Sequence, residues 1–311
     1  MKFPFTFTIL LLLSSCATQQ TSTQDQTTET QVIATDESIN AFCTETLTES
    51  PNLPAGDVLN LVQSKEGDPI AYDFAIENGA ELIPVDDDKS FAVWWEPENF
   101  DASTGTVLVS LHGHASWSVK GFEVWYPQIT ERNIAFLGLQ WWFGRSLENE
   151  GYYEPDQIYR LIAEQLEAKG ITPGNVIFEG FSMGSARSYG VSLYDHLCDE
   201  NYFGVNIANA GAWEDGYPLY SEILTKQYGD QPFEGTSWIL FCGEEDENEF
   251  ATTKVTHVCD GMENTKQRLE DMGANVVLFI KDPTGDHGSF NLNDENENTA
   301  MDKAEAVLED N

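Results

Sequence analysis

A serine near the middle of the chain stands where a nucleophile could be exposed. Residues 180–184 read Gly-Phe-Ser-Met-Gly and match the pattern G-x-S-x-G, with Ser182 at the centre. The motif follows an apolar stretch, residues 175–181, and opens a segment of helical spacing, residues 183–197. A tight turn from strand to helix needs small neighbours, and it would lift the serine hydroxyl above the carboxyl edge of a sheet, at the positive end of a helix dipole. The alternative is an incidental serine in a glycine-rich turn.

With this motif between strand and helix, the chain resembles the α/β-hydrolase superfamily. The resemblance implies an acid after a later strand and a histidine near the end, in the order Ser, Asp, His. Residues 243–246 (GEED) resemble the family's G-x-x-D and make Asp246 the acid, and residues 285–288 (GDHG) place His287 between glycines as the base. A histidine on a surface loop is the alternative for the base. Other carboxylates crowd the acid, so a neighbouring one is an open alternative: Glu244, Glu245 and Glu247.

A third part of the pattern is His-Gly-His at residues 112–114, directly after the apolar run 106–111. In similar esterases a His-Gly pair at this place shapes the oxyanion hole. The resemblance implies that an amide near Gly113 or His114 acts together with the Met183 amide. An ester carbonyl attacked by the serine would form an oxyanion that these amides bind, while the histidine takes the serine proton and the aspartate fixes the histidine tautomer.

The resemblance also bears on the substrate. The stretch 170–184 resembles the feruloyl esterases, polyhydroxybutyrate depolymerases and dienelactone hydrolases, although Ser182 stands where the dienelactone hydrolases have cysteine. The wider resemblance covers residues 79–310 and implies no metal or organic cofactor. Several aromatic side chains are expected on loops at the carboxyl ends of strands, where they could line a cleft for a small-molecule or polymeric ester; core packing is the alternative for the adjacent pair Trp141 and Trp142. These aromatic residues are Trp117, Trp125, Trp141, Trp142, Phe143 and Trp213.

Two other classes of function remain open at this point. A serine peptidase of the prolyl-oligopeptidase type would use the same triad, but such enzymes usually carry an added propeller domain, for which this chain has no room. A non-catalytic binding lipoprotein could keep the fold, yet it would not need Ser182, Asp246 and His287 together.

The pattern of elements that must position these residues predicts an α/β fold, with an eight-stranded and mostly parallel sheet and helices on both of its faces. Apolar, β-rich runs alternate with helical segments, and the continuous runs indicate strands buried on both faces. The first two strands alternate and predict an antiparallel edge. The expected strands are 81–85, 90–95, 106–112, 133–140, 175–181, 203–208, 238–242 and 275–281, and the expected helices are 155–169, 183–197, 264–272 and 299–309.

The composition of the chain limits the classes of partner that it is expected to bind. The chain has 311 residues, of which 15 are Lys or Arg and 53 are Asp or Glu, so its formal charge is −38. A phosphate backbone would be repelled, which excludes nucleic acid as an expected partner. Length and an apolar share of 41% favour one large domain. We expect a monomer with a catalytic domain over residues 79–311 and an N-terminal extension over residues 32–78.

The first residues indicate export. Residues 1–16 have one lysine, an apolar stretch too short to span a bilayer, and an ending, Leu-Ser-Ser-Cys, that resembles the bacterial lipobox. That resemblance implies cleavage before Cys16, lipidation of its sulfur and a membrane anchor. It also implies the outer membrane or cell surface, because alanine follows the cysteine. An ordinary secretory signal cut near Ala17 is the alternative. Residues 17–31, rich in Thr, Gln and Ser, predict a disordered tether.

Four further cysteines remain, an even number in an exported chain. Two disulfides with three possible pairings are therefore expected. We favour Cys242–Cys259, which closes a short loop, together with Cys43–Cys198; free buried thiols are the alternative. No cysteine or histidine spacing in the sequence is typical of zinc.

Overall fold

The structure, a computed structural model, describes residues 52–147, 149–198, 200–213, 216–217, 219–247 and 257–310. The predicted signal peptide and tether, with Cys16 and Cys43, lie outside these residues. The strands are β1 (Glu81–Val85), β2 (Ser90–Trp95), β3 (Val107–Leu111), β4 (Ala135–Leu139), β5 (Val176–Phe181), β6 (Phe203–Asn209), β7 (Ser237–Gly243) and β8 (Asn275–Asp282). The helices are α2 (Asp57–Gln63), α3 (Pro69–Glu77), α4 (Ser118–Arg132), the 3-10 turn η1 (Asn149–Gly151), α5 (Pro155–Lys169), α6 (Met183–Leu197), α7 (Tyr220–Leu224), α8 (Val258–Asp271), α9 (Ser289–Leu292) and α10 (Asp294–Asp310).

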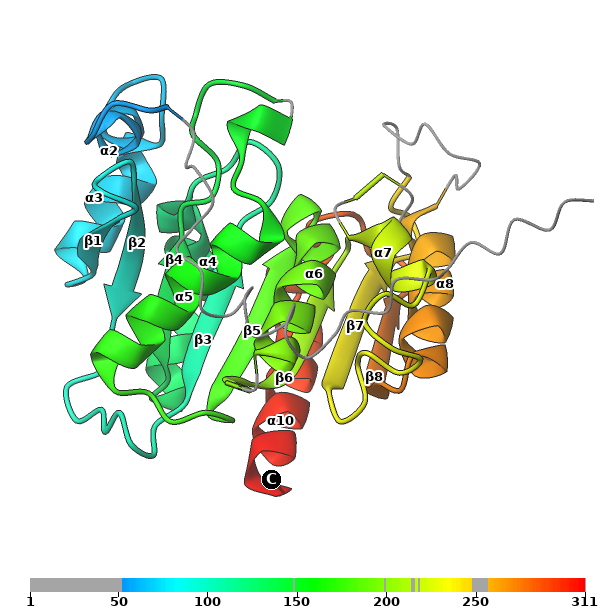
Figure 1. Cartoon of the computed structure of the whole chain (residues 1–311). Coiled ribbons are helices and arrows are strands. Elements are labelled where there is room, and N and C mark those ends of the chain that lie inside the picture. Colours follow the sequence, from blue (N-terminus) through cyan, green and yellow to red (C-terminus); the bar gives the residue numbers. More distant parts are fainter. Residues whose placement is uncertain are drawn as a thin grey trace, which may run out of the picture. The chain divides into compact units, whose positions relative to one another are not determined.

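The strands form one sheet in the order β1-β2-β4-β3-β5-β6-β7-β8 (Figure 1). Strand β2 runs antiparallel to both β1 and β4, and every pair from β4 across to β8 is parallel. The predicted eight-stranded sheet with an antiparallel edge is therefore confirmed. Because the parallel strands all end at one edge, the loops that follow β3, β5, β7 and β8 meet there.

Helices cover both faces of this sheet. Strands β3 and β4 are buried at every position, as expected for strands with helices on both sides. Helices α5 and α6 pack together in front of the sheet in Figure 1. Helix α4 packs on β2, β3 and β4 behind it, and Arg132 at its end pairs with Asp302 of α10 across 2.7 Å.

Two helices have the bounds that the sequence predicts, and their ends show why. Helix α5 begins at Pro155, whose fixed φ suits a first helical turn, and the Glu154 and Gln157 side chains form a reciprocal capping box. It ends at Gly170, which adopts the left-handed conformation at φ 73°. Helix α6 follows Ser182 directly, so its start is fixed by the turn that carries the serine.

Other helices were absent from the sequence prediction or longer than predicted. Helix α4 contains both Gly121 and Pro127, and its N-cap residue makes no side-chain capping bond, so its local signals are weak. Buried side chains such as Phe122 and Trp125 hold it in place instead. Helices α8 and α10 begin before the predicted residues 264 and 299. The described part of the extension forms α2 and α3, which contribute core residues: Val58, Val62, Ala71 and Ala75.

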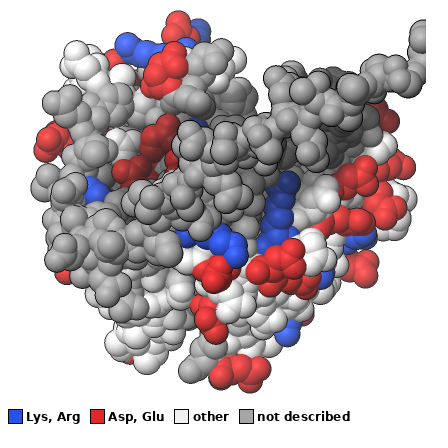
Figure 2. All heavy atoms as spheres, turned by 45° about the vertical axis from the view of Figure 1, so that its right-hand side comes forward, with Lys and Arg blue, Asp and Glu red and all other residues white. Residues whose placement is uncertain are grey.

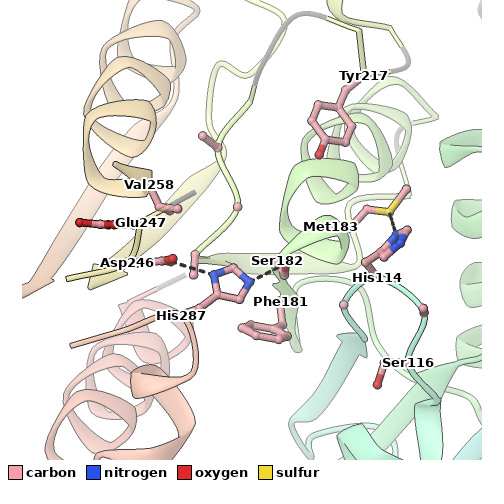
Figure 3. Close-up of a pocket in the computed structure, with 15 residues that line it drawn as sticks. His114, Ser116, Phe181, Ser182, Met183, Tyr217, Asp246, Glu247, Val258 and His287 are labelled. Atoms are coloured by element: carbon pink, nitrogen blue, oxygen red, sulfur yellow. Dashed lines mark hydrogen bonds and ion pairs between the residues drawn. The ribbon is translucent and has the colours of Figure 1, made fainter. Parts of the chain in front are cut away.

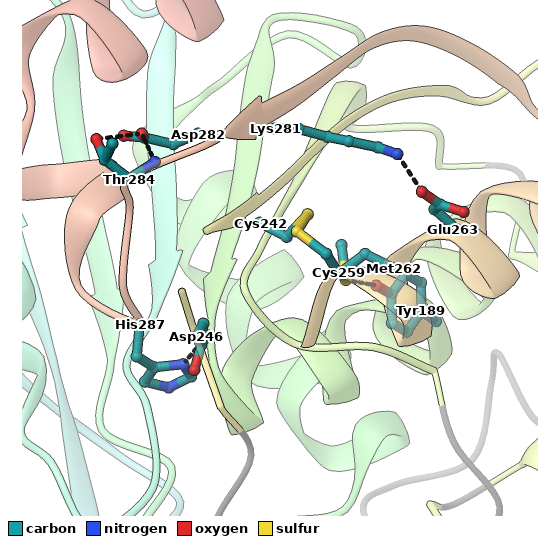
Figure 4. Close-up of a disulfide and its surroundings, with 10 residues drawn as sticks. All are labelled: Tyr189, Cys242, Asp246, Cys259, Met262, Glu263, Lys281, Asp282, Thr284 and His287. Atoms are coloured by element: carbon teal, nitrogen blue, oxygen red, sulfur yellow. Dashed lines mark hydrogen bonds and ion pairs between the residues drawn. A yellow bond between two sulfur atoms is a disulfide. The ribbon is translucent and has the colours of Figure 1, made fainter. Parts of the chain in front are cut away.

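The predicted disulfide between Cys242 and Cys259 is present, with 5.1 Å between the two Cα atoms (Figure 4). It joins the end of β7 to the first turn of α8. Cys198 is also disulfide-bonded, while Cys43, the partner predicted for it, lies outside the described residues. Over the described part of the chain, no group of three or more His, Cys, Asp or Glu residues is placed to hold a metal ion.

The acidic composition is visible on the surface. On the face shown in Figure 2, carboxylate side chains predominate over Lys and Arg among the described residues. Basic side chains of the described residues pair with carboxylates, as Lys281 does with Glu263 on α8. None of the helices within the described ranges is long and apolar enough to cross a membrane.

Candidate active site

Ser182 lies on a strained turn between β5 and α6. Its φ of 54° and ψ of −117° are a conformation that residues with a Cβ rarely adopt. The turn brings the start of α6 against the end of β3, and a Cβ on Gly184 would lie 2.3 Å from the carbonyl oxygen of Leu111. Only glycine fits that approach, which explains the second glycine of the sequence motif.

The structure brings three of the predicted side chains together (Figure 3). His287 Nε2 lies 2.8 Å from Ser182 Oγ, and His287 Nδ1 lies 2.7 Å from Asp246 Oδ2. The aspartate is buried, whereas the histidine side chain is 46% exposed. A carboxylate can only accept, so Nδ1 carries the proton and Nε2 is free to accept the serine proton.

Backbone hydrogen bonds join the loop that carries Asp246 to the loop that carries His287. The Glu244 amide donates to the Asp282 carbonyl at 2.8 Å, and the Glu245 amide donates to the Gly285 carbonyl at 2.9 Å. These bonds fix the aspartate relative to the histidine. Among the carboxylates that the sequence left open, Asp246 is the one with a hydrogen bond to the imidazole, while Glu244, Glu245 and Glu247 are exposed.

Asp282, which sequence reasoning did not single out, organises the loop that carries His287. Its carboxylate accepts hydrogen bonds from the Thr284 amide at 3.1 Å and the Asn296 side chain at 2.8 Å, and these bonds hold its pKa below the usual value. An aspartate just before Pro-Thr-Gly is a typical turn former, so the sequence did contain a signal for this role. Phe181 supports the imidazole from the other side, with the ring centres 5.0 Å apart.

The residues predicted for an oxyanion hole lie beside the serine. Gly113, His114 and Met183 all line the same cavity as Ser182. Met183 is the first residue of α6, so its amide belongs to the first turn, where N–H groups have no partner within the helix. We call residues 112–115 the HG loop. Within it, the buried His112 ring donates from Nδ1 to the Gly113 carbonyl at 2.8 Å, and burial lowers the pKa of His112 to about 4, which keeps the ring neutral.

The cavity over Ser182 has a volume of about 880 Å³, a size that suits an organic ligand. Apolar and aromatic side chains make up much of its described wall, with polar groups near the serine. The wall includes Phe181, Met183, Tyr217 and Val258, together with Ala115, Ser116 and Glu247 (Figure 3).

The aromatic residues predicted to bind substrate are not among the described residues that line this cavity, which corrects the sequence prediction; Trp125 moreover lies on helix α4 rather than on a loop. Trp141 and Trp213 are buried; the first stacks on His112 and the second on Tyr189. Trp117 is also buried, and Trp142 packs against it with the ring centres 5.2 Å apart. These segments lie near the carboxyl edge of the sheet, but the tryptophan rings point inward and pack against other side chains instead of lining the cavity.

Comparison with known proteins establishes the fold. No family model matches the chain, and no curated protein matches it. A fungal esterase from Rhizomucor miehei aligns with a TM-score of 0.55 at 14% identity, over 88% of this chain and 95% of its own. An esterase from the archaeon Pyrobaculum calidifontis aligns with a TM-score of 0.53 at 13% identity, over 81% and 93%. A dienelactone hydrolase-like protein from Klebsiella pneumoniae aligns with a TM-score of 0.53 at 13% identity, over 74% and 97%. The chain thus has the α/β-hydrolase fold.

Proposed function

We propose that this protein is a serine hydrolase that cleaves carboxylic esters through Ser182, His287 and Asp246. The observation that carries the proposal is the unbroken row of hydrogen bonds from the serine hydroxyl through the imidazole to a buried carboxylate. The strained turn under the serine and the cavity above it support the same conclusion. Similar folds described as esterases favour an ester over a peptide as substrate.

The geometry is suited to acyl transfer in two stages. His287 Nε2 takes the proton of Ser182 as Oγ attacks the ester carbonyl carbon, and the amides of Met183 and the HG loop bind the oxyanion. Collapse of this intermediate breaks the ester bond, and the alcohol leaves with the proton from His287. Water then attacks the acyl-enzyme with His287 as base, which releases the carboxylic acid and returns the proton to Ser182.

Asp246 takes no proton from the imidazole in either stage. It accepts a hydrogen bond from Nδ1, which keeps the ring in the tautomer that presents a lone pair to the serine, and it stabilises the imidazolium that forms. The backbone bonds between the Asp246 and His287 loops hold these two groups in place before substrate arrives.

Turnover of a chromogenic ester series tests the proposal. With p-nitrophenyl butyrate, Ser182→Ala should lose kcat by about 10⁴-fold or more while it remains folded. Ser103→Ala is the matched control, because this exposed serine precedes the first residue of β3 and so lies at the end of the strand that is opposite to the HG loop. A fluorophosphonate should label the native protein and the control at Ser182 but not label Ser182→Ala.

Each other result speaks against a part of the proposal. Undiminished hydrolysis by Ser182→Ala would remove the serine from its role. Complete failure of the native protein to turn over esters or take the label would favour a non-catalytic binding protein. Faster cleavage of matched peptide amides than of esters would favour a peptidase.

A further inference from the structure

Tyr152 touches the HG loop from the segment between β4 and α5. This side chain is buried, and its hydroxyl lies within hydrogen-bonding distance of two atoms that belong to cavity-lining residues. It is 3.2 Å from the Ala115 amide nitrogen and 2.9 Å from His114 Nδ1. One phenol therefore contacts both the backbone and a side chain of the loop that faces the oxyanion.

The atoms involved fix the direction of the first of these hydrogen bonds. The Ala115 amide can only donate, so the Tyr152 oxygen accepts that bond and its own proton is available for His114. Burial raises the pKa of Tyr152, which keeps the hydroxyl protonated. His114 Nδ1 is within hydrogen-bonding distance of this hydroxyl, so the phenol and the imidazole are joined whichever of the two donates. Met183 Sδ lies 3.2 Å from the same Nδ1, which places the ring between the phenol and the start of α6 (Figure 3).

The phenol itself is held by aromatic packing. Its ring centre lies 4.8 Å from that of Trp141, and Tyr152 also forms an antiparallel bridge with Trp142. The Trp141 indole N–H donates to the His112 carbonyl at 3.1 Å. Two neighbouring aromatic side chains thus send their only polar atoms to the same four-residue loop.

The HG loop needs such support because its backbone is strained. Ala115 has a φ of 51°, a left-handed conformation that disfavours a residue with a Cβ. Loosening the loop would let Ala115 return to an ordinary conformation and would move the amides beside Gly113 and His114. Small displacements of oxyanion donors have large effects, because their stabilisation depends on prior orientation.

We infer that Tyr152 is a positioning residue for the oxyanion hole: its hydroxyl holds the Ala115 amide and the His114 imidazole in place. The inference rests on the proposed ester hydrolysis. It gives the buried tryptophans a function as well, because Trp141 holds both the phenol and the first residue of the loop.

The test compares two adjacent tyrosines. Tyr152→Phe removes the hydroxyl and keeps the packing of the ring. Tyr153→Phe is the control, because the hydroxyl of this buried neighbour donates to Asp86 at 2.8 Å and neither residue lines the cavity. For Tyr152→Phe we expect kcat to fall about tenfold with KM nearly unchanged. The affinity for a trifluoromethyl ketone, which forms a tetrahedral oxyanion on Ser182, should fall by the same factor. Tyr153→Phe should keep the native kcat and inhibitor affinity even where its melting temperature falls.

Nitrogen NMR of the His114 ring provides a readout that a purely structural role would not change. The native protein should show Nδ1 as a hydrogen-bonded nitrogen, and Tyr152→Phe should shift that signal. Native kcat and inhibitor affinity in folded Tyr152→Phe would overturn the inference, while the inactivity of Ser182→Ala would still support ester hydrolysis. If Tyr152→Phe does not fold, Trp141→Phe removes the other bond to the loop and must show the same loss confined to kcat; a folded variant with native kcat overturns the inference.

Discussion

Cys242 and Cys259 are joined across the two ends of the segment that carries Asp246 (Figure 4). The bridge spans 17 positions in the sequence, and Asp246 lies four residues after its first cysteine. At the other end, the Val258 amide, next to the second cysteine, donates to the Asp246 carbonyl at 3.1 Å. The covalent bond and the hydrogen bond together fix the acid of the proposed triad relative to β7 and α8.

Removing this bridge should affect both stability and turnover. The double variant Cys242→Ala/Cys259→Ala should lower the free energy of unfolding by about 3 kcal/mol, because a closed loop of this length restricts the unfolded chain. It should also lower kcat, since the loop that holds Asp246 is then tied by hydrogen bonds alone. Urea denaturation and ester turnover of the same preparation measure the two effects. Native kcat in a clearly destabilised variant would show that the bridge does not position the acid.

Gly211, after β6, makes a second close approach to the serine. A Cβ at this position would lie 1.9 Å from the carbonyl oxygen of Ser182 and 2.7 Å from Ser185 Cβ. Gly211→Ala must therefore displace the turn, and we expect a loss of about 3 kcal/mol in stability and of most of the activity. Gly121→Ala on α4 is the opposite control: its Cβ would meet the nearest atom at 3.6 Å, and it should stabilise by up to about 1 kcal/mol. Equal effects of the two substitutions on the urea midpoint and on turnover would contradict this account.

Local signals were enough to predict the sheet and the position of the serine. Continuous apolar runs such as β3 and β5 are specified by their own residues, and the small residues around Ser182 follow from the tight turn. The acid and the histidine came from a resemblance, and their convergence is a property of strand order. That order is set by packing between elements that are distant in the sequence.

The cavity wall could not be predicted in the same way. A tryptophan on a loop at the right edge of the sheet can point outward or inward, and no local pattern distinguishes the two for Trp141. Tyr152 gave no signal either, because its contacts are to residues almost forty positions earlier. Helix α4 shows the same limit, since its packing overrides the weak helical preference around Gly121 and Pro127.

A buried carboxyl lies directly beneath the strained turn. Glu179 on β5 accepts hydrogen bonds from the Ser110 hydroxyl at 2.8 Å and from the Asn209 side-chain amide at 3.2 Å. The Asn209 carbonyl in turn accepts the Ser182 amide at 2.8 Å. Burial raises the pKa of Glu179 to about 7, against an ordinary value of 4.5, because a carboxylate away from water is poorly solvated; the nearby Glu297 acts in the same direction.

This shift predicts how stability depends on pH. Between pH 4.5 and about 7 the native state keeps a proton on Glu179 that the unfolded chain has lost. The contribution of this group to stability is therefore fully present below pH 4.5 and is lost as the pH rises to about 7. Glu179→Gln cannot titrate, so its free energy of unfolding should fall less steeply over this range than that of the native protein. The buried Glu297, whose pKa is also raised to about 7, adds a slope of the same sign to both proteins.

Urea denaturation at several pH values across this range measures the slope, which is independent of any constant loss that the new amide causes. Such a loss is expected, because the NH₂ group of glutamine would replace one of the two carboxylate oxygens and would face the donor on Ser110 or on Asn209. Glu131→Gln is the control, since it removes the same charge from an exposed position on α4 and should leave the native slope. If the free energies of unfolding of the native protein and Glu179→Gln change in parallel with pH, Glu179 does not change its protonation on folding between pH 4.5 and 7. The buried carboxyl would then have no part in the pH dependence of stability.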